Sequence, residues 1–204
     1  MDKVYDLIDP ADANPPRDNI TDASIFLQAF VFNVFGAVDN FARLWVWEKG
    51  VLNRKGNPLS NRQIGLMPSY DIVRESLSVP FQEYLTATAP WFEYLENYRH
   101  ALAHRIPLYI PPSRLNDEAA ARYHELEAAQ VAALKAREHD RFDELFDAQA
   151  ALGVFEPWMM HSYGPNDDDA RPVMFHGQMI CDLATLVEIG EKMVDELDAL
   201  PPAT

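Results

Sequence analysis

Residues 23–38 read ASIFLQAFVFNVFGAV, a run of sixteen residues without a charge. From this run to about Glu48, apolar side chains recur every three or four residues, which is the period of an α-helix that packs in a core. The pattern ends at Gly50, a residue type that often follows the last turn of a helix. The sequence therefore predicts a long helix over about 23–48. Because its opposite side is also apolar, we expect this helix to be surrounded by its own bundle or by a second subunit.

The composition fits a single globular domain. The chain has 204 residues, of which 48% are hydrophobic and 11% aromatic, enough to bury a sizeable core. Its formal net charge of −15 argues against general coating of nucleic acid, because phosphate binding needs clustered Lys and Arg. A small local basic site remains compatible with this charge.

The expected location is the cytoplasm, without a membrane span. Cys181 is the one cysteine, so the chain has no intramolecular disulfide and no thiolate zinc cluster. The first residues show no basic segment followed by an apolar run, so we expect no secretory signal. The uncharged run over 23–38 is shorter than the roughly twenty residues that cross a bilayer.

We expect an irregular leader over residues 1–20, which are polar and Pro-rich, and a single domain over residues 21–204. The domain should be mainly α, an up-and-down helical bundle with a small β addition. An insert over about 113–176 separates its core helices. Among the further elements we expect short helices over 70–77 and 80–88, and a helix over 91–104 that stops before Pro107. An extended arm follows over 106–112, and then a polar, protruding helical segment over 117–152 with a break near 137–140. Two short strands within 154–176 and a last helix over 177–197 complete the chain.

Residues 96–105 read ENYRHALAHR and form the densest cluster of functional side chains in the chain. An arginine offers planar, bidentate donors to a phosphate and stays charged, so Arg99 suits the stabilisation of a developing negative charge. A histidine titrates near neutrality, so His104 suits proton transfer to or from an oxygen of RNA. The segment therefore suits binding or cleavage of a phosphodiester.

The spacing from Arg99 to His104 resembles the Arg-x4–6-His motif of HEPN domains, a helical-bundle superfamily with many metal-independent ribonucleases. His100 stands where the family commonly has another polar residue after the arginine. The segment 38–41 also resembles part of the first long helix of such domains. The likeness covers about residues 24–48 and 90–105, and the final helix by pattern only.

The resemblance implies a bacterial-type HEPN homodimer that needs no cofactor and acts in toxin–antitoxin systems or phage defence. RNA or a nucleotide would be its ligand, and an antitoxin a possible protein partner. Arg99 would bind the phosphate, His104 would act as general acid or base and His100 would assist. Arg105 would contact the substrate. Asp39 and Asn40 would either orient the site or join a core network.

One geometric condition limits this site. Five residues along an ideal helix correspond to about 140° around the axis, so Arg99 and His104 do not share a face. They converge only if the helix frays at His104 or if two subunits pair their motifs.

Two other interpretations of this segment stay open. In the structural one, Arg99 pairs with Glu96 or Glu93, and His104 interacts with the helix dipole at the C-terminus. In the metal one, Glu96, His100 and His104 lie on one helix face, and a further ligand comes from a residue that folds back. The candidates for that ligand are His161, His176 and Asp182.

The sequence leaves open whether the chain is an enzyme. The first hypothesis is a metal-independent endoribonuclease or a nucleotide-binding protein of the HEPN type. The second is a non-catalytic helical interaction protein, and the third is a metal-dependent hydrolase.

Overall fold

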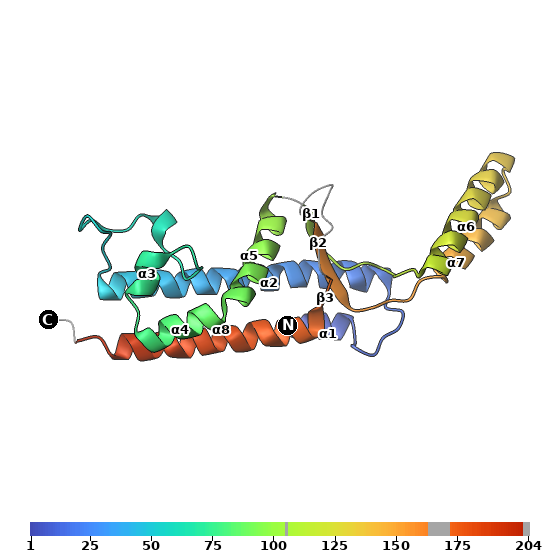
Figure 1. Ribbon diagram of the computed structural model, residues 1–204. Coiled ribbons are helices and arrows are strands. Elements are labelled where there is room, and N and C mark those ends of the chain that lie inside the picture. Colours follow the sequence, from blue (N-terminus) through green and yellow to red (C-terminus); the bar gives the residue numbers. More distant parts are fainter. Residues whose placement is uncertain (105, 163–171, 202–204) are drawn as a thin grey trace.

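The longest element of the computed structural model is α2 (Arg17–Lys49), a helix of 33 residues along which the body of the protein packs (Figure 1). The structure describes residues 1–104, 106–162 and 172–201, and for residues 103, 104, 106 and 162 it describes only the main chain. The fold is mainly α-helical with a small three-stranded antiparallel sheet, as predicted. α2 ends at Gly50, which adopts the left-handed conformation with φ of +67°. That conformation is easily reached by glycine and explains the predicted stop.

Two further long helices complete the body. α8 (Phe175–Asp198) lies along α2, and α5 (Ala89–His104) crosses both of them steeply (Figure 1). The core has one cluster of buried side chains at each half of α2. The first cluster joins residues of α2, α5 and α8 such as Leu27, Leu95 and Met179, and the second joins Val38, Phe92 and Ile189. α2 and α8 therefore run in the same direction.

The prediction of an irregular leader over residues 1–20 is wrong. Residues Asp2–Leu7 form helix α1, and α2 already begins at Arg17. Val4 and Ile8 are fully buried against the first half of α2 and the start of α8. Because the core holds these two apolar side chains, a helix too short to be stable alone is formed.

The connection from α2 to α5 contains three short helical elements. These are η1 (Asn61–Gln63), α3 (Asp71–Glu75) and α4 (Val79–Ala87). Pro80 lies in the first turn of α4, where its missing N–H leaves no hydrogen bond unmade. The two short helices expected near residues 70–77 and 80–88 are thus confirmed.

The sheet follows directly from the end of α5. Its strands are β1 (Ile106–Tyr109), β2 (Trp158–Ser162) and β3 (Val173–Met174), in that spatial order. Both pairings are antiparallel, with Ile106 opposite Ser162 and Trp158 opposite Met174. The expected extended arm and the two expected strands are confirmed. The segment between these two strands, residues 163–171, lies outside the described residues.

The polar segment predicted to protrude does so. α6 (Asp117–Ala136) and α7 (His139–Ala150) form a helical hairpin that projects away from the body (Figure 1). The two helices separate at Arg137, whose φ is +62°, within the predicted break. The hairpin has a small cluster of its own, centred on Leu126, Ala133 and Leu145.

Candidate functional site

Arg99 lies on α5 with its side chain over an aromatic ring of α2. The guanidinium carbon is 5.3 Å from the centre of the Phe35 ring, which is a cation–π contact. Arg99 is partly exposed, and no carboxylate of a described residue lies within ion-pair distance of it. The Phe35 ring therefore covers one face of the Arg99 guanidinium group, and the N–H groups of the guanidinium stay available to a ligand.

Asp39 is the acidic group of this region. It is partly buried on α2, and burial raises its pKa, while the positive charges of Arg43 and Arg99 oppose that rise. Asp39 is thus electrostatically coupled to Arg99, which fits the predicted orienting role. Asn40, the next residue on α2, is exposed and takes no part in a core network.

The predicted ion pair of Arg99 with Glu96 or Glu93 is absent among the described side chains. Glu96 approaches His100, not Arg99, with 3.9 Å between the Glu96 carboxylate oxygen and the His100 Nε2 atom. Both side chains are about half exposed, at 46% and 47%. An exposed pair at this distance contributes little to stability. The His100 side chain is therefore accessible to a ligand.

The remaining residues of the motif are less completely described. α5 stays helical through His104, but the side chain of His104 lies outside the described residues, and so does all of Arg105. His104 is the last residue of α5, so fraying at His104, the first of the two routes to convergence, falls on a side chain outside the described residues. A continuous helix places Arg99 and His104 about 140° apart around its axis.

A metal centre is not assembled in the part of the chain that the structure describes. No group of three His, Cys, Asp or Glu side chains converges there. The three residues expected to supply a further ligand lie elsewhere. The His161 ring packs against Tyr98 at 4.3 Å, the Nε2 atom of His176 lies 2.8 Å from the carbonyl oxygen of Ile8, and Asp182 contacts α5.

Asp182 has a structural role that sequence reasoning missed. Its side chain is 1% exposed, and its Oδ1 atom accepts hydrogen bonds from the Trp91 indole at 2.9 Å and from the Gln178 amide at 2.7 Å. Its Oδ2 atom accepts a hydrogen bond from the Tyr94 hydroxyl at 3.2 Å. Burial raises the pKa of Asp182, and these hydrogen bonds oppose the rise. The carboxyl group thereby fixes α5, which carries Arg99, onto α8.

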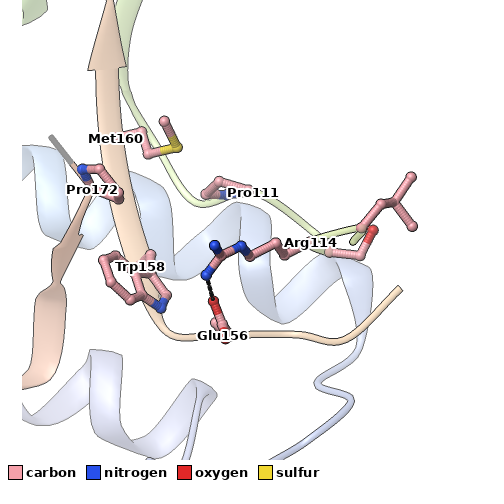
Figure 2. A pocket seen from close by; sticks show the side chains of 8 residues that line it. Pro111, Arg114, Glu156, Trp158, Met160 and Pro172 are labelled. Carbon is pink, nitrogen blue, oxygen red and sulfur yellow. Dashed lines mark hydrogen bonds and ion pairs between the residues drawn. The ribbon is translucent and has the colours of Figure 1, made fainter. Parts of the chain in front are cut away.

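A cavity of about 520 Å³ lies where the projecting hairpin joins the sheet. Figure 2 shows its lining, in which Trp158, Met160 and Pro172 face Pro111 and Arg114. Arg114 donates to the Glu156 carboxylate at 3.1 Å. The lining is mostly apolar, so the cavity suits an apolar or aromatic group. The sequence signal for this cavity was the alternation of side chains along β2. It places Trp158 and Met160 on the face opposite to the buried Met159 and His161.

Comparisons of the chain with family models, with curated proteins and with solved structures find no match. The resemblance to HEPN domains therefore stays a prediction that rests on the motif and its place at the end of α5.

Proposed function

We propose that the chain is a HEPN-type, metal-independent endoribonuclease that acts as a cytoplasmic homodimer, in toxin–antitoxin systems or phage defence. The observation that carries this proposal is the environment of the Arg99 guanidinium group. Its guanidinium is held against Phe35, and its charge is not consumed by an ion pair with any described carboxylate. A positioned cation with free N–H edges suits a phosphate.

The proposed reaction needs only groups that the motif supplies. Arg99 donates two hydrogen bonds to the phosphate oxygens and stabilises the charge that grows in the transition state. His104 removes the proton from the 2′-hydroxyl group, whose oxygen attacks the phosphorus atom. The bond to the 5′-oxygen breaks, and His100 or a second His104 protonates that oxygen. The products are a 2′,3′-cyclic phosphate and a 5′-hydroxyl end.

The proposed mechanism includes the pairing of two chains. Because Arg99 and His104 are about 140° apart around the axis of a continuous helix, we expect Arg99 to meet His104 through the pairing of two motifs. Apolar side chains are available for such a contact on the outer side of α8. Ile180, Leu183, Val187 and Val194 are spaced as a helical stripe and are all exposed.

The dimer is expected to dissociate when a charge is placed in this stripe. Val187→Glu should lower the solution mass from twice the chain mass of 23.2 kDa to the single value, because a buried unpaired carboxylate opposes association. Light scattering at several protein concentrations measures this. Val131→Glu is the matched control, since Val131 is similarly exposed on the projecting hairpin, at 49% against 50% for Val187. A monomeric wild-type chain, or equal masses for both variants, contradicts an α8 dimer.

The activity itself is tested by cleavage of a mixed RNA substrate in the presence of EDTA. We expect His104→Ala to lower the cleavage rate by about 100-fold or more, because a positioned acid–base group contributes that much. Equal EDTA-resistant rates for wild type and variant would remove His104 from the mechanism. Absence of activity in both, across RNA of all four bases and varied structure, would favour a binding protein.

A second candidate function is a non-catalytic helical interaction protein. α2 favours it, because Trp47, Ile25 and Phe32 are exposed by 70%, 57% and 52% on the outside of the longest helix. α2 is also the one described helix that is long and apolar enough to cross a membrane, a criterion that core helices of soluble proteins meet as well. In this alternative, a partner such as an antitoxin covers α2. The third hypothesis, a metal-dependent hydrolase, has only the pair Glu96 and His100 in the described side chains.

A further inference from the structure

A second cavity, of about 570 Å³, lies beyond the C-terminal half of α2 and has a different chemistry. Its lining combines two arginines with hydroxyl, phenol and amide groups, and it includes Arg54, Arg62, Gln63, Ser69, Tyr70 and Asp71. We call it the basic cleft. The surrounding segment, residues 43–74, has six Lys or Arg and two Asp or Glu, a local charge of 6 − 2 = +4 in a chain of −15. The cleft therefore lies in a positive region of an acidic protein.

Both arginines of the cleft are presented by ordered turns. Arg54 lies in a turn where the Asn53 side-chain oxygen accepts from the backbone N–H groups of Lys55 and Asn57, at 2.9 and 3.1 Å. Arg62 lies in η1, whose start is fixed by a capping box between Ser60 and Gln63. Such side-chain hydrogen bonds hold a short turn in one conformation. The backbone positions of Arg54 and Arg62 are thus fixed by these turns.

The Tyr70 ring packs closely against the backbone at Gly65. A Cβ atom added at Gly65 would lie 2.5 Å from the Tyr70 ring, so only glycine lets the ring approach the backbone there. Asp71 is the one carboxylate in the lining, and its charge also acts on Arg74, where it opposes the lowering of the Arg74 pKa by burial. With two exposed arginines and one carboxylate, the lining carries a net positive charge.

One hydrogen bond and the charges of two arginines connect the region of the basic cleft with that of Arg99. The Arg43 guanidinium donates to the Asn61 side-chain oxygen at 3.1 Å, which ties α2 to the start of η1, next to Arg62. The positive charges of Arg43 and Arg99 both act to lower the pKa of Asp39. Positive groups therefore follow one another along α2 from Arg99 through Arg43 to Arg62 and Arg54.

We infer that the basic cleft binds a second backbone phosphate of the single-stranded RNA whose scissile phosphate lies at Arg99. This inference rests on the proposed function, and it makes the substrate a strand of several nucleotides and not a mononucleotide. Arg54 and Arg62 donate to the phosphate oxygens, Ser69 and Gln63 add neutral donors, and the Tyr70 ring offers a face on which a base stacks. The Lys and Arg of residues 43–74 attract the intervening phosphates in spite of the global charge.

The test is the salt dependence of binding to a fluorescein-labelled oligouridylate of about 20 nucleotides, measured by anisotropy in EDTA. The variant is Arg54→Ala with Arg62→Ala. Its matched control is Arg122→Ala with Arg141→Ala, which removes the same charge from exposed ion pairs on the projecting hairpin. We expect the cleft variant to bind about tenfold more weakly, and its slope of log K against log salt to be smaller by about 1.4, or 0.7 for each lost contact on a single strand. The control should match the wild type.

Three outcomes would overturn the inference. The first is equal affinity and equal slope in the two double variants, and the second is no binding of the oligouridylate by the wild type at low salt. The third is a loss of affinity for uridine monophosphate as large as that for the oligonucleotide, which would make the cleft a mononucleotide site. Cleavage assays separate this inference from the proposed function. Loss of strand binding in the cleft variant, with cleavage that does not depend on Arg99 or His104, supports the cleft and contradicts the ribonuclease site.

Discussion

Replacing Arg99 with alanine is expected to lower EDTA-resistant RNA cleavage by about 1000-fold, the upper range for loss of one transition-state donor. The loss should appear mainly in the rate of the chemical step under saturating RNA, because the charge that Arg99 stabilises grows in the transition state. Arg99→Lys keeps the charge but loses the bidentate fork, so we expect an intermediate loss. Single-turnover kinetics on a labelled RNA measure both variants.

The controls for Arg99 separate catalysis from stability. Arg122→Ala removes an arginine from an exposed ion pair on the hairpin and should cleave at the wild-type rate. Thermal unfolding of each variant shows how much protein is folded. If Arg99→Ala lowers the unfolding temperature while the folded protein cleaves normally, then Arg99 only packs against Phe35 and the proposed site is wrong.

The elements that the sequence predicts best are those whose own residues decide them. α2 follows from its uncharged run and from Gly50, and α5 must end before Pro107 whatever it packs against. The two-helix hairpin follows from helix propensity interrupted near Arg137. α1 was missed because six residues are too few to show a clear period, and only the burial of Val4 and Ile8 in the core reveals the helix.

The site was predicted less well, because its contacts join residues distant in sequence. Local spacing suggested Glu96 or Glu93 as the partner of Arg99, whereas the structure gives the ring of Phe35 on another helix. The basic cleft brings together Arg54, Arg62 and Tyr70 from three turns without any periodic pattern. The local excess of Lys and Arg over residues 43–74 was the one sequence signal for it.

The largest change in stability is expected from Asp182→Ala. The substitution leaves the Trp91 indole N–H and the Tyr94 hydroxyl group without their acceptor in the contact between α5 and α8, and it opens a small cavity. Buried donors without a partner cost about 1–3 kcal/mol each, so the free energy of unfolding should fall by about 3 kcal/mol. Chemical denaturation at neutral pH measures this. Because α5 also carries Arg99, RNA cleavage by this variant should be lost at lower temperature than in the wild type.

Asp182→Asn is the control that separates the hydrogen bonds from the charge. Its side-chain oxygen still accepts from Trp91 and Gln178, so its stability at neutral pH should lie within about 1 kcal/mol of the wild type. Burial raises the pKa of Asp182 above 3.8, so between 3.8 and the raised value the folded state binds more protons than the unfolded state. The free energy of unfolding of the wild type should therefore fall, relative to Asp182→Asn, as the pH rises through this window, and the difference should be constant above it. Equal stabilities of the alanine and asparagine variants would show that Asp182 does not hold α5 onto α8. A difference that does not change with pH would show that burial does not raise the pKa of Asp182.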